Sequence, residues 1–367
     1  MVLFFPIATA VYAAFLLWLD RGVTHIAKED RAKHKPHEHQ SISIIIAAKN
    51  ELHNLPRLLA SLAELEYPQE CFEIILINDH STDGSKEYLE SQSLCPNMKL
   101  INHYHDSPQI IGKKAAIQQG IMTAKHDILA FTDADCLVPT TWLSEINRAM
   151  TNDVDYLLSY SIIKRKPEDS IWRMKNFERS VYYALASAGL YYHIPFTSMA
   201  CNMVYRKSIF IKSGGFDGIG HFASGDDDLL LMKMMPHIRK AAYNCSPQMH
   251  ICSIDGTDAI KHHHTNIRRA SKFFLHPWWL QGLSLFVFLY FVLFYYQIAL
   301  LILGEASVVA LMCLLIKTGT ELYLSVHHLH LISRAKLGAL YPVQILLFPA
   351  QFIFYAIRGT LGKYRWK

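Results

Sequence analysis

Residues 127–135 of the chain are Asp-Ile-Leu-Ala-Phe-Thr-Asp-Ala-Asp, and this stretch decides the fold class. Its apolar part, Ile128–Phe131, has no polar alternation, which is typical of a β-strand covered on both faces. Thr132–Asp135 follows at once. Because residues i and i+2 of an extended chain point to the same side, Asp133 and Asp135 can face one ligand together. We therefore expect a buried strand with two carboxylates just beyond its carboxyl end.

The preceding sequence repeats this strand-then-loop pattern and alternates it with helices. The predicted elements are a strand at 41–48, a helix opening at Asn50-Glu51, a strand at 72–77, a helix ending near Gln92, a strand near 99–104 and a helix after Gly112. Such alternation predicts an α/β fold, a mostly parallel sheet with helices on both faces. Ligands bind beyond the carboxyl ends of such strands, so loops 78–83 and 132–135 should share one edge.

Apolar residues gather at both ends of the chain. The apolar runs are Val2–Leu19, Trp278–Ile316 with a turn near Gly304-Glu305, and Leu337–Ile357. About 20 apolar residues span a bilayer, so these runs predict transmembrane helices. We expect an N-terminal anchor at 1–20, a basic linker at 21–40, a soluble domain at 41–275 and a C-terminal membrane region at 276–367 with about three apolar segments.

Charge and cysteine content indicate where the soluble domain lies. Basic residues at 28, 31, 33 and 35 follow the first run, which places the domain in the cytoplasm, at the cell inner membrane. The seven cysteines are an odd number without a C-x-x-C pair, as in a reducing compartment. The net charge of +5 lies near the membrane flanks and favours lipid headgroups over nucleic acid. Four spans would put both ends outside, yet the tail is basic, so one C-terminal segment is expected to be interfacial or re-entrant.

The paired aspartates can hold a metal ion. Asp133 and Asp135 would repel each other without a cation between them, and their hard oxygen ligands suit Mg²⁺ or Mn²⁺. Such an ion would neutralise a diphosphate leaving group, which transfer from a nucleotide sugar requires. The alternative is a solvated turn or a helix cap.

Two further stretches favour a nucleotide-sugar site. Asp79 ends the second strand, where it can accept hydrogen bonds from a nucleobase or ribose; the alternative is helix capping, the role we expect for Asp83. Lys113 and Lys114 open a helix, where cations are disfavoured. A bound phosphate would explain these lysines, and a solvated pair is the alternative.

Asp226-Asp227-Asp228 precede an apolar helical run, and capping needs one of them. An inverting sugar transfer needs a general base to deprotonate an acceptor hydroxyl, and a carboxylate among like charges suits this task. We expect Asp227 to be the base, with Asp226 as the next candidate.

As a set, these residues resemble family 2 of the glycosyltransferases, an inverting family with the nucleotide-sugar-binding fold called GT-A. The resemblance covers roughly residues 42–273. The matching stretches, in the family's order, are IIIAAKNE at 44–51, IILINDHSTDGS at 74–85, GKKAAIQQG at 112–120, ILAFTDAD at 128–135, VYRKSIFIKSGGF at 204–216 and SGDDDLL at 224–230.

The resemblance implies roles for the matching positions. Asp79 resembles the nucleotide-binding aspartate, Asp133 and Asp135 the metal-binding pair, and Asp227 the base. The implied donor-binding residues are Ala48, Asn50, Glu51, Asp79, Lys113, Lys114 and Asp133.

Membrane-bound polysaccharide synthases of this family also carry Gln-x-x-Arg-Trp after the base. Here Arg268 can stand for the arginine, and it joins Lys113 as a candidate for stabilising the departing diphosphate. A register one residue later would use Asn266 and Arg269 instead. Neither register contains the tryptophan that normally helps to hold a growing polymer, which implies a single transfer.

The sequence thus predicts a metal-dependent inverting glycosyltransferase, with hexose transfer expected. The expected donor is a UDP-sugar, and the expected acceptor is a membrane-embedded lipid or polyprenol-linked glycan. The alternatives are a processive polysaccharide synthase, a catalytically inactive membrane scaffold and a nucleotidyltransferase.

Overall fold

A computed structural model describes residues 4–31, 38–92, 96–104, 107–164, 170–222, 224–254 and 259–361 of the chain. The predicted basic positions Lys33 and Lys35 and the basic tail 362–367 lie outside the described residues. The chain divides into two compact units. The sheet unit contains Gly22–Trp172 and Tyr182–Asp255, and the helical unit contains Met1–Arg21, Arg173–Val181 and Gly256–Lys367.

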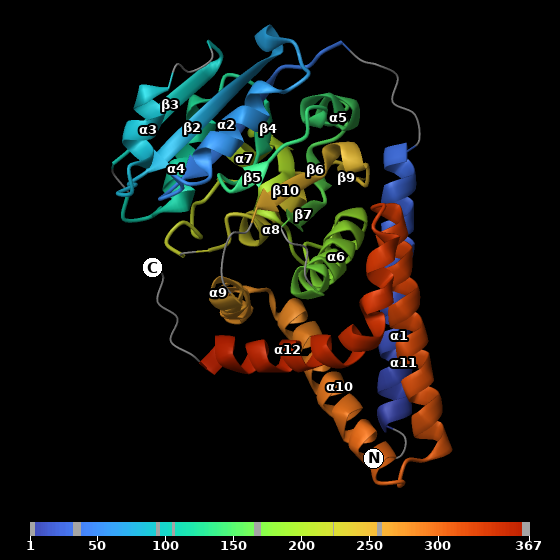
Figure 1. Ribbon diagram of the computed structural model, residues 1–367. Helices are drawn as coiled ribbons and strands as arrows, with labels where there is room; N and C mark the ends of the chain where they lie inside the picture. The colour runs from blue at the N-terminus through green and yellow to red at the C-terminus, as the bar shows by residue number, and fades with distance from the viewer. Residues whose placement is uncertain are drawn as a thin grey trace. The chain divides into compact units, whose positions relative to one another are not determined.

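The sheet unit is built on a seven-stranded sheet in the order β3-β2-β1-β4-β8-β6-β9 (Figure 1). Its strands are β1 (Ile42–Ala48), β2 (Phe72–Asp79), β3 (Met98–His103), β4 (Ile128–Phe131), β6 (Tyr156–Ser159), β8 (Met203–Arg206) and β9 (Ala241–Asn244). A three-stranded sheet contains β5 (Cys136–Leu137), β7 (Ser161–Lys164) and β10 (Ile251–Ile254). Strands β3, β2, β1 and β4 are parallel, whereas β8 runs antiparallel to β4 and β6. The predicted mostly parallel α/β sheet is confirmed.

Helices cover both faces of the parallel strands, as their apolar sequences require. Ile44 and Ile46 belong to the same buried core as Leu58 of α2. On the opposite face, a Cβ added to Gly120 of α4 would lie 2.7 Å from Ile77 Cδ1 and 2.9 Å from Ile45 Cγ2, so α4 approaches the sheet as closely as glycine allows. The helices and short 3₁₀ turns of this unit are α2 (Leu55–Ala63), α3 (Ser85–Ser91), α4 (Lys113–Thr123), α5 (Trp142–Ala149), α7 (Lys207–Lys212), α8 (Asp228–Met234), η1 (Gln69–Cys71), η2 (Ala200–Asn202), η3 (Met235–His237) and η4 (Pro247–Met249).

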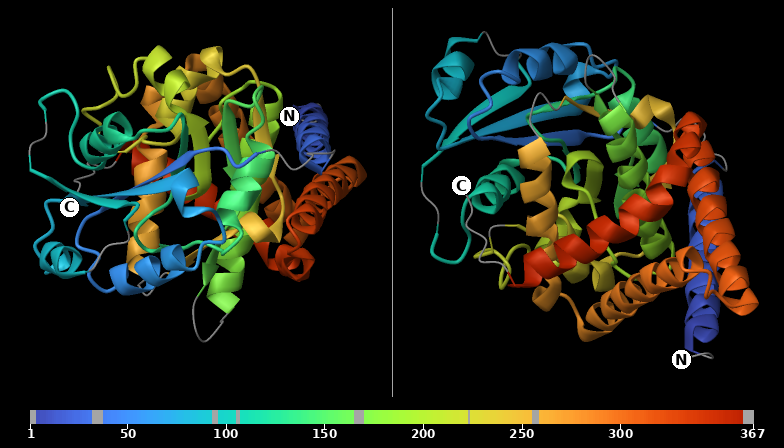
Figure 2. Two further views of the ribbon diagram at one scale, coloured as in Figure 1. Left: turned by 90° about the horizontal axis from the view of Figure 1, so that it is seen from above. Right: turned by 60° about the horizontal axis from the view of Figure 1, so that its bottom comes forward.

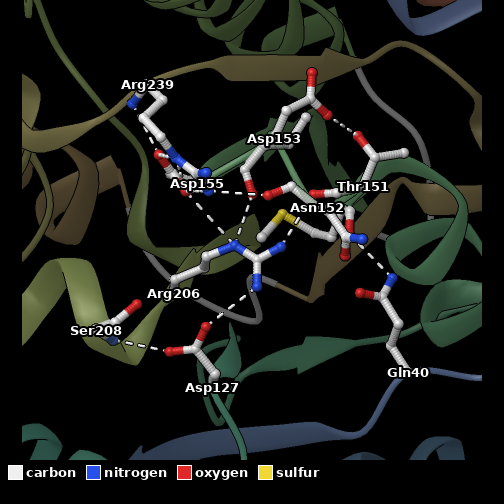
Figure 3. Close-up of polar contacts among 11 residues, drawn as sticks. Gln40, Asp127, Thr151, Asn152, Asp153, Asp155, Arg206, Ser208 and Arg239 are labelled. Atoms are coloured by element: carbon white, nitrogen blue, oxygen red, sulfur yellow. Dashed lines mark hydrogen bonds and ion pairs between the residues drawn. The ribbon is translucent and has the colours of Figure 1, made fainter.

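An ionic network closes the amino edge of the sheet, where β4, β6 and β9 begin (Figure 3). Asp155 is completely buried and accepts from Arg239 Nη2 at 2.6 Å and Nε at 2.9 Å. Arg206, at the end of β8, lies 3.5 Å from Asp155 and 3.1 Å from Asp127 Oδ2. These contacts tie the antiparallel strands to the parallel ones.

The helical unit contains the long apolar helices (Figures 1 and 2). Its elements are α1 (Phe4–Arg31, as far as Arg21), α9 (Ala259–Ala270), α10 (Trp278–Ile302), α11 (Val308–Leu331), α12 (Tyr341–Leu361), η5 (Phe273–Leu275), η6 (Ala335–Leu340) and the middle of α6 (Ser170–Tyr191). Among the described residues, four helical segments are long and apolar enough to cross a membrane: Phe4–Glu29, Trp278–Ile302, Val308–Leu331 and Ala335–Leu361. These match the predicted apolar runs, including the turn near Gly304.

Buried polar contacts hold the first helix against the later ones. Glu321 of α11 accepts from Tyr12 of α1 at 2.8 Å, from Tyr341 at 3.1 Å and from the completely buried Lys317 at 2.8 Å. The α1 and α11 helices lie side by side in both figures, whereas α12 runs crosswise to them (Figures 1 and 2). Polar groups inside an apolar bundle are stable when they are paired with one another in this way.

Two predicted boundaries differ from the structure. The predicted linker at 21–40 begins as a continuation of α1 through Arg31, because Val23 and Ile26 are buried and prolong the apolar side of the helix. The predicted soluble domain extends to residue 275, whereas the sheet unit ends at Asp255 and α9 belongs to the helical unit.

Candidate active site

The carboxyl ends of β1, β2 and β4 meet at one edge of the sheet. The strands are parallel neighbours, with β1 between β2 and β4. Their ends lead into Ala48, Asp79 and Thr132–Asp135 respectively. The expectation that loops 78–83 and 132–135 share an edge is therefore confirmed.

Asp79 is almost completely buried at the end of β2. Its Oδ1 lies 2.8 Å from Nδ1 of His80, and His80 has a φ of 53°, a conformation uncommon for residues other than glycine. The His80 ring meets the His103 ring edge-on, with centroids 5.4 Å apart. Neither histidine was selected from the sequence. The sequence places residue 103 in the strand predicted near 99–104. In the structure this strand, β3, pairs with β2 and places His103 opposite Asp79.

Asp133 and Asp135 place their carboxylates together, as the sequence predicts. Ligand atoms of Asp133, Asp135 and Cys136 all lie within 4.8 Å of one another. A hydrogen bond with Cys201 and burial raise the pKa of the Cys136 thiol. Sulfur is also a soft ligand, which Mg²⁺ and Mn²⁺ do not prefer. The two carboxylates supply the hard oxygen donors that Mg²⁺ and Mn²⁺ prefer, and they fit such an ion.

Lys113 joins the aspartate pair to the acidic run before α8. Its Nζ lies 2.8 Å from Asp133 Oδ1 and 3.0 Å from Asp226 Oδ2. Burial lowers the pKa of Lys113, but the two carboxylates outweigh burial and raise it well above its ordinary value, so the side chain remains an ammonium. Residues 113, 133 and 226, widely separated in sequence, thus form one charged cluster.

Lys114 takes a different position from the one predicted. Its side chain is buried, and Nζ donates to the backbone oxygens of Ile219 at 2.7 Å, Phe222 at 2.9 Å and Ser224 at 2.7 Å. An ammonium has three N–H donors, and these carbonyls accept all three. The predicted contact with a donor phosphate is therefore corrected: Lys114 binds protein backbone.

The three consecutive aspartates have three different environments. Asp226 faces Lys113. Asp227 is the N-cap of α8, and its Oδ1 accepts from the amide of Asp228 at 2.7 Å. Asp228 is buried and accepts from the amide of Leu229 at 2.8 Å. Two of the three aspartates thus accept from amides at the start of α8, one more than the sequence predicts, and Asp226 belongs to the charged cluster.

Asn50 and Glu51 connect the loops that follow β1 and β2. Asn50 accepts from the amide of Thr82 at 2.8 Å and donates its own amide to Ser81 at 3.0 Å. The Glu51 amide donates to Ser85 at 3.1 Å. Asp83 accepts from the amide of Ser85 at 3.0 Å, but the N-cap residue of α3 is Gly84 rather than Asp83. Ala48 is buried at the end of β1. A donor-binding role for Ala48, Asn50 and Glu51 stays a prediction.

Arg268 lies on α9 in the helical unit. It is not among the sheet-unit residues that form the charged cluster. Its predicted contact with a leaving diphosphate stays a prediction.

Comparison with known structures identifies the class of this fold. A solved mannosyltransferase, PcManGT from Pyrobaculum calidifontis in complex with GDP-Man and Mn²⁺, superposes with a TM-score of 0.53 at 15% identity, covering 98% of this chain and 100% of that one. The sheet unit thus has the GT-A glycosyltransferase fold.

The family follows from the sequence match. Residues 43–214 match the family described as Glycosyl transferase family 2. Undecaprenyl-phosphate 4-deoxy-4-formamido-L-arabinose transferase of Aeromonas hydrophila is 30% identical over 36% of this chain and 39% of its own length. Poly-beta-1,6-N-acetyl-D-glucosamine synthase of Staphylococcus epidermidis is 28% identical over 37% of this chain and 32% of its own. The matched stretch spans about a third of these relatives. Residues 43–214 thus form a glycosyltransferase family 2 domain.

Proposed function

We propose that this protein transfers one sugar, with inversion, from a nucleotide sugar to a lipid-linked acceptor at the membrane. The observation that carries the proposal is Lys113, whose ammonium contacts both Asp133 of the aspartate pair and Asp226 of the acidic run. This contact brings the groups expected to hold the leaving diphosphate next to the groups expected to activate the acceptor.

The proposed reaction divides its work among these residues. The acceptor oxygen bonds to the anomeric carbon while the bond from that carbon to the diphosphate oxygen breaks. Asp227 takes the acceptor proton, with Asp226 as the alternative base. A divalent cation held by Asp133 and Asp135 would supply positive charge to the leaving diphosphate. Lys113 and Arg268 are the proposed side chains that offset the remaining negative charge.

Asp79 is proposed to bind the nucleoside. Its carboxylate lies at the end of β2, beside the end of β1 and one strand away from the Asp133–Asp135 loop. A nucleotide whose diphosphate reaches the aspartate pair would place its ribose or base near this carboxylate. The donor is proposed to be a UDP-sugar first and a GDP-sugar second, because the solved neighbour binds GDP-Man.

The acceptor is proposed to be lipid-linked. The relative from Aeromonas hydrophila is named for an undecaprenyl-phosphate acceptor, and four helical segments of this chain can span a membrane. We further propose an inner-membrane location with the sheet unit in the cytoplasm, where nucleotide sugars are made. We also propose that one C-terminal apolar segment lies in the membrane interface or is re-entrant, which would keep the basic tail inside.

The test uses the full chain in native membranes or detergent. The protein is incubated with Mn²⁺ or Mg²⁺, lipid extract and a panel of labelled nucleotide sugars, and lipid and polymer fractions are separated. We expect label in one lipid-soluble product, abolished by a chelator and restored by the metal. The matched control is Asp135→Asn. If no sugar gives more product with the wild type than with this variant, the proposal is wrong.

A processive synthase is the second candidate, because the relative from Staphylococcus epidermidis is named as a polymer synthase. Product length separates the two. A long polymer made by the purified protein from one nucleotide sugar would replace single transfer by processive synthesis.

A further inference from the structure

One loop of the sheet unit is held by two lysine side chains from different helices. We call residues 213–222, Ser224 and Gly225 the carbonyl loop. It connects α7 to the acidic run Asp226–Asp228. Lys114 of α4 donates to the carbonyls of residues 219, 222 and 224, as described above. Lys233 of α8 donates to those of Gly214 at 3.3 Å, Gly215 at 2.7 Å and Asp217 at 2.6 Å.

The conformation of this loop needs those positive charges. Six of its backbone oxygens point at two ammonium groups, and without the cations these oxygens would be brought together with no donor between them. Burial of an ammonium is costly unless its donors are satisfied, and here each lysine contacts three acceptors. The loop also uses left-handed glycines, with φ of 74° at Gly214, 75° at Gly218 and 98° at Gly225. Glycine adopts such φ values without the steric cost that a Cβ would bring, so these residues allow the backbone to turn.

The carbonyl loop lies against the segment that leads into α4. A Cβ added to Gly220 would lie 2.4 Å from the oxygen of Gln109, and the amide of Ile111 donates to the oxygen of Gly220 at 3.2 Å. Gly112 and Lys113 follow directly. Two adjacent residues of α4 therefore have different partners. Lys114 contacts the carbonyl loop, and Lys113 contacts Asp226, which directly follows the loop.

We infer that Lys114 and Lys233 are positioning residues for the acceptor side of the reaction. By fixing the carbonyl loop, they place Asp226 and Asp227 beside Lys113 and the aspartate pair. This inference rests on the proposed function and deepens it. The donor-side residues Asp79, Asp133 and Asp135 follow β2 and β4 and do not belong to the loop, so their binding of the nucleotide sugar should not depend on it.

The test compares transfer with donor binding in the full-length protein. Lys114→Met keeps the length of the side chain but removes its charge and donors. We expect kcat for transfer to fall about 30-fold, because the base loses its placement, while donor KM changes less than about threefold. Lys233→Met should act in the same direction by about tenfold, and Lys233→Arg, which keeps the charge and donors, should restore most of the rate.

Lys207 provides a matched control. Its Nζ also donates to backbone oxygens, those of Met122 at 3.3 Å and Ala124 at 2.7 Å, but it lies near the amino end of β4. Lys207→Met should leave kcat and donor KM unchanged. If Lys114→Met lowers kcat and donor affinity equally, or matches Lys207→Met, the positioning role is overturned.

Hydrogen exchange gives a readout that does not require transfer activity. Amides of residues 213–222 should exchange at least about tenfold faster in Lys114→Met and Lys233→Met, while peptides from β2 and β4 keep their wild-type rates. If the wild-type protein makes no product, the proposed function fails. Faster exchange confined to the carbonyl loop would still support its fixing by Lys114 and Lys233. Unchanged exchange in the loop of these variants would overturn the inference that the two lysines fix the carbonyl loop, whatever the transfer activity. If Lys114→Met does not fold, kinetics and hydrogen exchange are measured on Lys233→Met and Lys233→Arg instead.

Discussion

The two edges of the seven-stranded sheet both carry aspartates, but in opposite electrostatic environments. At the amino edge, Asp127 and Asp155 face the guanidinium groups of Arg206 and Arg239 (Figure 3). At the carboxyl edge, Asp133 and Asp135 face each other, with ligand atoms within 4.8 Å. Strand β4, only four residues long, separates Asp127 from the latter pair.

This difference is the one that we expect between an edge that stabilises the fold and an edge that binds a ligand. Opposite charges placed together satisfy each other and lower the free energy of the folded chain. Like charges placed together raise it unless a cation joins them. At the carboxyl edge, Lys113 compensates part of this repulsion through its contacts with Asp133 and Asp226. A bound cation would supply the remaining positive charge, and the grouping of carboxylates there is the reason that we propose this edge as the active one.

The largest expected effect comes from removing a charge at the carboxyl edge. Asp135→Asn should lower sugar transfer about 10³-fold, because the leaving diphosphate loses its counter-charge. The melting temperature should stay the same or rise, since a repulsion is removed. Labelled-sugar transfer and thermal unfolding measure the two properties. Asp127→Asn, at the other end of β4, is the control and should leave kcat unchanged; equal losses in both variants would contradict the comparison.

The next effect separates the two kinds of acceptor. Asp227→Asn should lower kcat about 10²-fold with an acceptor hydroxyl, which must lose a proton, while donor KM stays near that of the wild type. A lipid phosphate is already an anion, so with such an acceptor the loss should be several-fold smaller. Parallel kinetics with Asp226→Asn identify the base, because the larger loss belongs to the residue that takes the proton.

At the amino edge the expected effect is on stability. Asp155→Asn leaves Arg206 and Arg239 without their shared carboxylate and should lower the free energy of unfolding by about 2 kcal/mol. This figure is modest because Arg239 is largely exposed. Chemical denaturation followed by tryptophan fluorescence measures it. Transfer per folded molecule should not change, and a specific loss of kcat would show that this edge is not merely structural.

The smallest effect is a pH dependence from the same carboxylate. Burial raises the pKa of Asp155, but hydrogen bonds and charge from Arg239, together with the charge of Arg206, more than offset it, so the pKa lies below its ordinary value. The resulting stability is complete above the unfolded-state pKa of about 4 and is lost as the pH falls through the folded-state value. The gap in unfolding free energy between wild type and Asp155→Asn should therefore narrow below about pH 4. A gap that widens on acidification would contradict this sign.

The parallel half of the sheet could be predicted from the sequence because its signals are local. Residues 42–48 and 72–79 are apolar runs followed directly by polar loops, and their helices lie between them in the sequence. The antiparallel half could not be predicted in this way. Strands β6, β8 and β9 have four residues each, and β8 pairs with β4 across more than 70 residues of chain. A four-residue run carries too little periodicity to distinguish it from a buried turn of helix. Strand β4 is equally short, but the polar loop Thr132–Asp135 marks its end, and β6, β8 and β9 have no such mark.

The site shows the same limit. Asp79, Asp133 and Asp135 follow strands, and the sequence alone places them at one edge. The environment of Lys114 depends on carbonyl groups at positions 219–224, about 100 residues further along the chain. Backbone carbonyls have no side-chain signature, so no pattern distinguishes Lys114 from its neighbour Lys113. Such a contact becomes visible only when the chain is folded.

The contact between Tyr12 and Glu321 has a consequence for how the protein is made. The two residues are 309 positions apart. The Asp20 carboxylate of α1 likewise lies 2.6 Å from Nδ1 of His327 of α11. At a synthesis rate of 5–20 residues per second, the ribosome needs roughly 15–60 s to reach the partner after the first helix has formed. During that time Tyr12 and Asp20 are part of a nascent chain in which Glu321 and His327 have not yet been added. Helix α1 thus acquires these neighbours late, and assembly of the helices finishes after translation of the residues between them.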